Sequence, residues 1–336
     1  MKYVVNLEQG LSQFKIMAFR LDFIGLDNNL QFSNSILLTR RMCSVQMKKT
    51  VIYKSNDCFS IKADFYGNSK DHAPVIVYIH GGGLVWGTRE GISDEMIKFY
   101  NDNGFALFSI DYRLAPETKL PGILDDVQDA LRWLKSEGPN EFSIDPERIA
   151  VVGSSAGGFL ALCTGSFTHK PRAIVSFYGY GDITGKWATN PSSFYLQKDH
   201  VTKNIARRLI SDQVITEASI EQRFLYYVYA RQQGIWIQEI TGINPKIHKD
   251  ALLKFCPKQN ITRDYSPTLL LHGTKDEDVP YEQSVFMRGA LIKERVETKL
   301  ITIPNGEHVF DKDFDNPVVQ GALRQVIEFL QYHLSE

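Results

Sequence analysis

A serine flanked by glycines follows a short apolar run in the stretch IAVVGSSAGG, residues 149–158. The run at 149–152 predicts a strand, and the small and apolar residues after the glycines predict a helix. The pattern G-x-S-x-G between a strand and a helix is typical of a nucleophile elbow, a sharp turn that exposes Ser155 at the start of the helix. Gly153 and Gly157 suit this turn because they place no side chain where strand and helix approach. We therefore expect Ser155 to be a nucleophile; the alternative is an incidental serine in a glycine-rich turn.

Short apolar runs recur on both sides of this stretch and predict the rest of the fold. Because most of them are continuous rather than alternating, they indicate strands buried on both faces of a parallel sheet. The expected strands cover residues 50–53, 60–65, 75–79, 105–110, 149–152, 173–177, 268–271 and 300–303, and helical spacing follows at 121–134, 282–295 and 317–334. This alternation predicts an α/β fold, a doubly wound and mostly parallel central sheet flanked by helices, with its chemistry beyond the carboxyl ends of the strands.

One interval breaks the alternation. About 90 residues separate the strand ending at Phe177 from the strand starting at Thr268, far more than an ordinary crossover needs. Helical and aromatic residues fill the interval, so we expect a helical cap insertion at 181–262 between two parts of a core at 46–180 and 263–336. Residues 1–45 form an N-terminal segment whose helical spacing could add to the cap.

Composition excludes several classes of protein. The chain has 336 residues, 38 Lys and Arg against 39 Asp and Glu, and a net charge of −1, so it lacks the positive field of a nucleic-acid binder. With 43% hydrophobic residues it has the composition of a folded globular protein. No apolar run approaches the roughly 18 residues of a membrane helix, and no C-x-x-C pair suggests a metal site. We expect a cytoplasmic protein without a metal.

A second glycine run follows another strand. Residues 75–79 lead into HGGG at 80–83, where backbone N–H groups can point at a developing oxyanion. Glycines can also form a flexible turn or a phosphate loop, but no Lys-Ser/Thr pair follows, and the chain has no G-x-G-x-x-G with an acidic partner. The sequence therefore favours an oxyanion loop and no nucleotide cofactor.

A serine nucleophile needs a base and an acid that orients the base. The strand at 268–271 leads into HGTKDEDVP, which places Asp276 on a loop just past a buried strand. The strand at 300–303 leads into PNGEHVF and gives His308 the same kind of position. The histidines at 80 and 272 precede glycines in turns, where a hydrogen-bonded structural role is the better interpretation. Ser155, Asp276 and His308 are thus the predicted catalytic residues.

These motifs together resemble the α/β-hydrolases of the hormone-sensitive-lipase-like esterase group, over residues 48–336. The resemblance is carried by HGGG at 80–83, DYRLAPE at 111–117 and GSSAGG at 153–158. It implies that the backbone N–H groups of Gly82, Gly83 and Ala156 are the oxyanion donors, and that DYRLAPE is structural.

Two features of the sequence depart from that group. Ser154 stands where the group commonly has Asp, and the acid loop is similar to the H-G-x-x-D-x-x-V-P form of prolyl-oligopeptidase-like and feruloyl-esterase-like hydrolases. That form selects Asp276 over Asp278, because Val279 lies three positions after Asp276. Asp278 is then expected to cap the helix that starts near Tyr281.

The expected function is a cofactor-independent carboxylesterase that cleaves a small-molecule ester with a short acyl group. An amidase, a formamidase or a small peptidase with the same triad is the first alternative. A non-catalytic small-molecule receptor on the same fold is the second, and the intact loop around His308 disfavours it.

Overall fold

The computed structural model describes residues 48–68 and 71–335. The N-terminal segment at 1–45, which could add to the cap, lies outside the described residues. Within the described part of the chain, none of the helices has the length and apolar character needed to cross a membrane.

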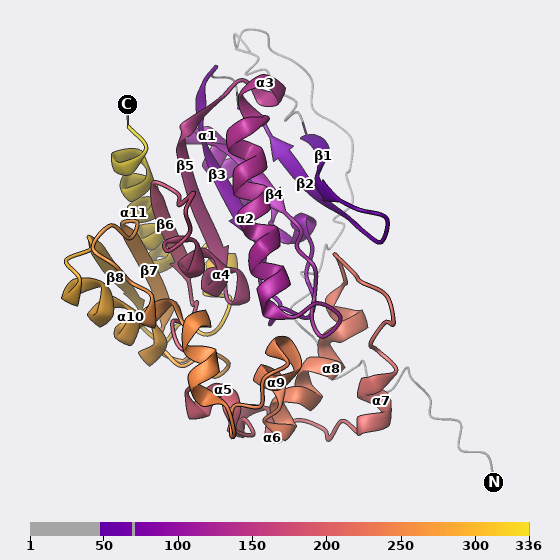
Figure 1. Cartoon of the computed structure of the whole chain (residues 1–336). Helices are drawn as coiled ribbons and strands as arrows, with labels where there is room; N and C mark the ends of the chain where they lie inside the picture. Colours follow the sequence, from indigo (N-terminus) through magenta and orange to yellow (C-terminus); the bar gives the residue numbers. More distant parts are fainter. Residues whose placement is uncertain (1–47, 69–70, 336) are drawn as a thin grey trace, which may run out of the picture. The chain divides into compact units, whose positions relative to one another are not determined.

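The core is an eight-stranded sheet with the order β1-β2-β4-β3-β5-β6-β7-β8. Strands β1 and β2 pair antiparallel, as do β2 and β4, and the remaining neighbours are parallel. The bounds are β1 (Lys48–Ser55), β2 (Ser60–Tyr66), β3 (Ala73–Ile79), β4 (Ala106–Ile110), β5 (Ile144–Ser154), β6 (Ala173–Phe177), β7 (Thr268–Gly273) and β8 (Thr298–Ile303). This sheet confirms the predicted α/β fold (Figure 1).

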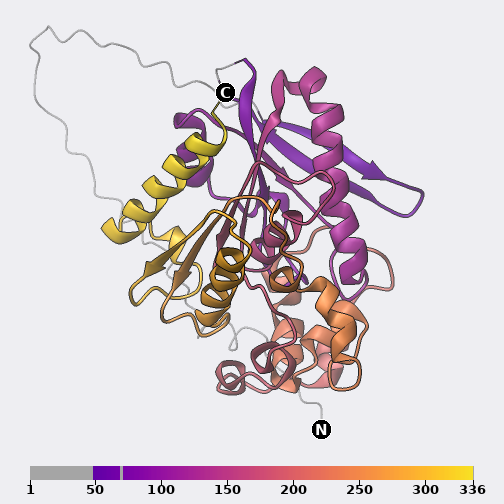
Figure 2. The same ribbon diagram turned by 60° about the vertical axis from the view of Figure 1, so that its left-hand side comes forward.

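Alternate residues of the strands bury two separate apolar cores because successive side chains of a strand point to opposite faces. Val75, Val77 and Ile79 of β3 join one core, whereas Ile76 joins the other. The first core includes the apolar faces of α2 (Leu120–Ser136), α4 (Ala156–Thr164) and α10 (Glu282–Lys293). The second includes α1 (Asp94–Asp102) and α11 (Pro317–His333). Helices α2 and α11 accordingly flank the strands on opposite sides (Figure 2).

The long interval between β6 and β7 is helical, and we call residues 181–262 the cap. Its helices are α5 (Lys186–Thr189), α6 (Ser193–Leu196), α7 (Lys203–Arg207), α8 (Ile220–Gln233), α9 (Trp236–Thr241), η3 (Lys249–Phe255) and η4 (Pro257–Gln259). Ser219 and Gln222 form a capping box at the start of α8, and Gly234 ends it in the left-handed conformation. Helices α5 to α9 gather beyond one end of the sheet (Figure 1).

Candidate active site

Ser155 occupies a strained turn between β5, which ends at Ser154, and α4, which begins at Ala156. Its φ of 55° and ψ of −118° lie where a residue with a side chain rarely sits, at a cost of about 1–3 kcal/mol. The neighbouring glycines are required by space: a Cβ on Gly153 would lie 2.2 Å from the Gly157 carbonyl oxygen, and one on Gly157 would lie 2.0 Å from that of Ile79. The side chain of Ser155 stays partly exposed, as an elbow requires.

Two hydrogen bonds join Ser155, His308 and Asp276 in a chain. The Nε2 atom of His308 lies 3.0 Å from Ser155 Oγ, and its Nδ1 atom lies 2.7 Å from Asp276 Oδ2. Because an ionised carboxylate only accepts, Nδ1 carries a proton and neutral His308 presents a lone pair to the serine hydroxyl. This is the tautomer that a general base needs.

The carboxylate of Asp276 is held from several sides. Its Oδ1 accepts the backbone N–H groups of Asp278 at 3.0 Å and Val279 at 2.9 Å. Its Oδ2 faces His308 and, at 3.3 Å, Nε2 of His272. Burial opposes ionisation, but hydrogen bonds from the two histidines outweigh it and hold the pKa of Asp276 at about 2. Asp276 is therefore a stable anion throughout the neutral range.

His272 takes the hydrogen-bonded position expected of it. Its Nδ1 lies 2.7 Å from Ser284 Oγ, and its Nε2 lies 3.0 Å from the carbonyl oxygen of Val279. Since that carbonyl can only accept, Nε2 carries a proton and can also point it at Asp276. His272 thus contacts the acid loop at Asp276 and Val279 and the start of α10 at Ser284.

The environment of His308 favours its protonated form. Burial lowers the pKa of His308, but the hydrogen bond to Asp276 and the negative charges of Asp276, Asp278 and Asp311 outweigh burial and raise it above the ordinary value. The ring of Tyr178 lies 4.6 Å from the imidazole between centroids, and its hydroxyl donates to Asp311 Oδ1 at 2.5 Å. Tyr178 and Asp311 were not among the predicted site residues, and no sequence motif marks them.

The glycine loop after β3 lies against the serine, since a Cβ on Gly81 would approach the Cβ of Ser155 to 3.3 Å. Its peptide groups are fixed by their carbonyls. The Gly81 carbonyl accepts from His80 Nδ1 at 2.8 Å, and the Gly82 carbonyl accepts from the N–H of Val85 at 2.9 Å. In a trans peptide the N–H points away from the C=O, so these bonds set the directions of the Gly82 and Gly83 N–H groups.

His80 is buried and neutral near pH 7, because burial lowers its pKa to about 4. Its ring stacks on that of Tyr112 at 4.3 Å between centroids, and the Tyr112 hydroxyl donates to the His80 carbonyl at 3.1 Å. The third predicted donor, Ala156, is the first residue of α4, where backbone N–H groups have no partner within the helix.

The DYRLAPE segment ties neighbouring elements together. Asp111 pairs with Arg89 at 2.7 Å, Arg113 pairs with Asp126 of α2 at 2.7 Å, and Glu117 pairs with Arg223 of cap helix α8 at 2.6 Å. The last pair is almost fully buried, with side chains 3% and 4% exposed. The three ion pairs thus connect the segment to other parts of the core and to the cap.

The expectation for Asp278 is wrong. Helix α10 has Tyr281 at its N-cap position without a side-chain capping bond. The Asp278 carboxylate instead accepts from Tyr227 Oη at 3.1 Å and pairs with Arg231 at 3.1 Å, both on α8. The full charge of a buried guanidinium, which must be paired, takes this carboxylate in place of the helix end. Arg231 and Tyr227 were not predicted, since their partner lies about 50 residues further along the chain.

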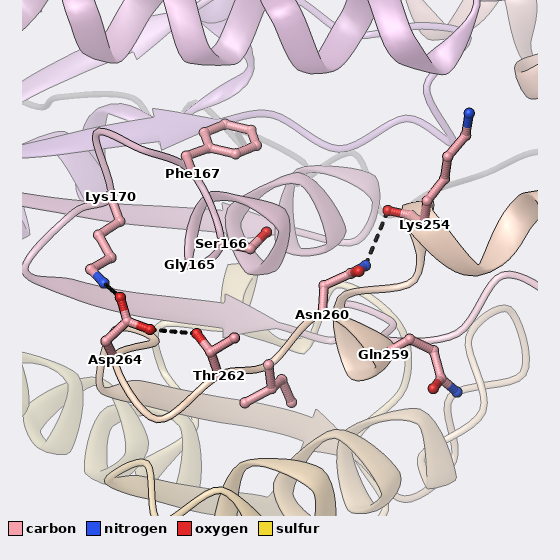
Figure 3. A pocket seen from close by; sticks show the side chains of 10 residues that line it. Gly165, Ser166, Phe167, Lys170, Lys254, Gln259, Asn260, Thr262 and Asp264 are labelled. Atoms are coloured by element: carbon pink, nitrogen blue, oxygen red, sulfur yellow. Dashed lines mark hydrogen bonds and ion pairs between the residues drawn. The ribbon is translucent and has the colours of Figure 1, made fainter.

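A cavity of about 510 Å³ lies elsewhere, between the carboxyl end of α4 and the end of the cap. It is lined by Gly165, Ser166, Phe167, Lys170, Lys254, Gln259, Asn260, Ile261, Thr262 and Asp264 (Figure 3). Two contacts join residues of its lining: Lys170 is bonded to Asp264, and Asn260 donates to the Lys254 carbonyl at 3.0 Å. None of the predicted catalytic residues lines it, so it is separate from the site around Ser155.

Known proteins resemble this chain, one group in sequence and another in fold. A segment of a non-reducing polyketide synthase of Preussia isomera is 28% identical over 334 residues, covering 84% of this chain; the chain spans only 13% of that synthase's length. An alpha/beta hydrolase superfamily protein from Enterococcus faecalis has a TM-score of 0.69 at 21% identity, covering 85% of this chain and 99% of its own. An esterase from Thermogutta terrifontis has a TM-score of 0.60 at 21% identity, covering 85% and 92%.

The family follows from a match over the middle of the chain. The model of the BD-FAE family matches residues 64–291, which include the glycine loop, the serine elbow, the cap and the acid loop. With this match and the eight-stranded sheet described above, the chain belongs to the BD-FAE family of the α/β-hydrolase superfamily.

Proposed function

We propose that this protein is a carboxylesterase that cleaves short-acyl esters without a cofactor, with Ser155 as nucleophile, His308 as base and Asp276 as the orienting acid. The observation that carries the proposal is the pair of hydrogen bonds at 3.0 and 2.7 Å that joins the three side chains beside the glycine loop. The motifs at 80–83 and 111–117 add support through their resemblance to the hormone-sensitive-lipase-like esterases.

The proposed reaction has two steps, acylation of Ser155 and hydrolysis of the acyl-serine. Ser155 Oγ attacks the ester carbonyl while its proton moves to His308 Nε2, and the carbonyl electron pair becomes an oxyanion. When the tetrahedral intermediate collapses, the alcohol leaves with the proton from His308 and an acyl-serine remains. Water then attacks the acyl-serine with the same proton transfers, releasing the carboxylic acid and free Ser155.

The oxyanion is stabilised by backbone N–H groups that are oriented before the reaction. Gly82, Gly83 and Ala156 are the proposed donors; the first two are fixed through their peptide carbonyls, and the third lies at a helix start. Loss of one such donor typically lowers turnover about a hundred- to a thousandfold. Asp276, ionised because its pKa is about 2, keeps the imidazole in the required tautomer and stabilises the imidazolium.

The solved relatives suggest a reagent for the test. The Thermogutta terrifontis esterase 2, at 20% identity, has been seen phosphorylated by paraoxon. We expect organophosphorus reagents to phosphorylate this chain at Ser155, because they mimic the tetrahedral intermediate of acyl transfer.

The deciding experiment measures initial rates on p-nitrophenyl esters of increasing acyl length and on the matching anilides, for the wild type and Ser155→Ala. We expect hydrolysis of short esters that falls roughly a millionfold in the variant. Faster cleavage of anilides than of esters would instead identify an amidase. Tight binding of small molecules without turnover or labelling would identify a receptor.

A further inference from the structure

Arg231, on cap helix α8, is a buried cation with only 2% of its side chain exposed. Its guanidinium group lies among four aromatic rings of the cap, with ring centroids at 5.1–5.5 Å: Trp187, Tyr195, Tyr227 and Trp236. Such a group is costly to bury unless it is paired and hydrogen-bonded. The groups that pair with Arg231 therefore indicate which parts of the protein this side chain connects.

The ion-pair partner of Arg231 lies on the acid loop of the core, and its other partners, Tyr227 and the Trp187 carbonyl, lie in the cap. Arg231 Nη1 lies 3.1 Å from Asp278 Oδ1, and Nη2 donates to the Asp278 backbone carbonyl at 3.2 Å. Tyr227 links the two, accepting from Arg231 Nη1 at 2.8 Å and donating to Asp278 Oδ1 at 3.1 Å. The N–H of Asp278 in turn donates to Asp276 Oδ1 at 3.0 Å. A continuous chain of contacts therefore runs from the cap cation to the predicted catalytic acid.

The same part of the cap also holds the glycine loop. The ring of Tyr227 lies so close to Gly83 that a Cβ on that glycine would come within 2.6 Å of a ring carbon. Trp236 Nε1 donates to the Gly83 carbonyl at 3.0 Å. Tyr227 also packs edge-on against Trp86 at 5.0 Å between centroids. One aromatic cluster thus contacts the loops on both sides of Ser155.

We propose that Arg231, acting with Tyr227, is a positioning residue that fixes the acid loop and the oxyanion loop relative to each other and neutralises Asp278 beside the catalytic base. The inference rests on the proposed function, since it concerns the same Ser155 site. It assigns to the cap a part in turnover.

Electrostatics give the proposal a distinctive signature. His308 faces the carboxylates of Asp276, Asp278 and Asp311 and the ring of Tyr178, and the three carboxylates favour its protonated form. Arg231 offsets only the charge of Asp278, because only Asp278 is its ion-pair partner among these groups. Removing Arg231 should strengthen the negative field at His308 and shift the acid limb of the rate profile to higher pH.

The main test compares Arg231→Met and Arg231→Lys with Arg223→Met as the matched control. Arg223 lies on the same helix and makes a buried ion pair with Glu117, away from the acid loop. With p-nitrophenyl acetate, Arg231→Met should lower kcat about 10- to 100-fold with less change in KM. It should also move the acid limb of the pH–rate profile to higher pH. Arg231→Lys should retain the position of the limb with an intermediate kcat, because Lys keeps the charge but not the bidentate geometry. Arg223→Met should lower the thermal midpoint yet leave kcat per folded molecule and the limb unchanged.

Two further variants keep the proposal testable if Arg231→Met folds poorly. Tyr227→Phe keeps the ring against Gly83 and removes only the hydroxyl, so a severalfold loss of kcat in a folded protein is expected. The double variant Arg231→Met with Asp278→Asn removes both charges. Its acid limb should lie at the wild-type pH or lower, and its kcat should stay low. Wild-type kcat in Tyr227→Phe and in folded Arg231 variants would overturn the positioning role.

The rate of Ser155 labelling by an organophosphonate separates this inference from the proposed function. If the wild type is labelled but hydrolyses no ester, the proposed substrate class fails, and slower labelling of Arg231→Met would still support the positioning role. Equal labelling rates for the wild type and folded Arg231→Met, with the same acid limb, would overturn it even if ester hydrolysis is confirmed.

Discussion

Nε2 of His308 lies 3.0 Å from Oγ of Ser155, although 153 positions separate the two residues in the chain. Ser155 follows β5 and His308 follows β8, and β6 and β7 lie between these strands in the sheet. Because β5 to β8 are parallel, the loops at their carboxyl ends meet at one edge and bring the two side chains within hydrogen-bond reach. The proton transfer that we propose from the serine therefore requires no rearrangement of the loops.

The choice of Asp276 as the acid predicts unequal effects of two neighbouring substitutions. In Asp276→Asn the backbone N–H groups that donate to Oδ1 keep the amide oxygen on their side, so a donating NH2 faces His308 Nδ1 and kcat should fall by about four orders of magnitude. Asp278→Asn removes a partner of Arg231 but leaves the acceptor for His308 Nδ1 in place, so its loss of kcat should be at least about a hundredfold smaller. Steady-state kinetics on one p-nitrophenyl ester tests this. A larger loss in Asp278→Asn would reassign the acid.

The environment of His308 predicts the pH dependence of turnover. The base must be neutral to accept the serine proton, and its pKa is raised by Asp276 and the other nearby carboxylates despite burial. Activity should therefore be present at high pH and be lost as pH falls through a value above the ordinary 6.5 of histidine. Asp276, with a pKa of about 2, stays ionised across this range and adds no second limb. A profile of kcat/KM from pH 5 to 9 measures the limb, and a midpoint below 6.5 would contradict the assignment.

The backbone conformation of the glycine loop predicts that one added methyl group will lower kcat severely. Gly82 has a φ of +105°, and a Cβ there would lie 2.1 Å from the Trp86 carbonyl oxygen. Gly82→Ala should displace the proposed oxyanion donors and lower kcat about a hundred- to a thousandfold. Gly289→Ala in α10 is the control, because its Cβ would meet nothing within 4 Å. The control should keep full activity and gain about 0.5–1 kcal/mol in unfolding free energy. Similar activity in both variants would exclude this loop from the chemistry.

Substitution of His80 should lower turnover, although His80 is not proposed to touch the substrate's reacting atoms. Its Nδ1 proton holds the Gly81 carbonyl and, through that peptide, the direction of the Gly82 N–H. His80→Ala should lower kcat about 10- to 100-fold from pH 5 to 9, since burial lowers the pKa of His80 to about 4 and keeps the ring neutral over that range. The wild-type acid limb should be unchanged. A variant with wild-type kcat would show that the loop holds its shape without this bond.

The sequence was most informative where structure is decided locally. Continuous apolar runs predicted six of the eight strands, and the run at 50–53 with the alternating pattern at 60–65 predicted the other two. The edge strand β8 is an exception to the expected burial on both faces, since its buried residues alternate with exposed or half-buried ones. Ser155, Asp276 and His308 could be proposed because each stands directly after such a strand. The start of β5 was placed too late, since Ile144 joins the sheet only by pairing with Ala73 across a register shift.

Contacts between distant segments could not be predicted in the same way. Asp278 was expected to cap a helix because its local sequence allows it, and only the fold brings Arg231 within 3.1 Å of it. The pairing of Tyr178 with Asp311 likewise joins positions 133 apart with no motif at either. Side chains that support the site were therefore missed, whereas those proposed for the chemistry itself were named.

The central claim is that Ser155 is an activated nucleophile, and covalent labelling tests it most directly. The protein is incubated with an organophosphonate at neutral pH and digested, and the modified peptide is identified by mass spectrometry, with Ser155→Ala and His308→Ala alongside. We predict one adduct per chain on Ser155 in the wild type, none at that site in Ser155→Ala, and slowed labelling in His308→Ala. An adduct on another residue, or no adduct on a folded wild-type protein, would contradict the claim.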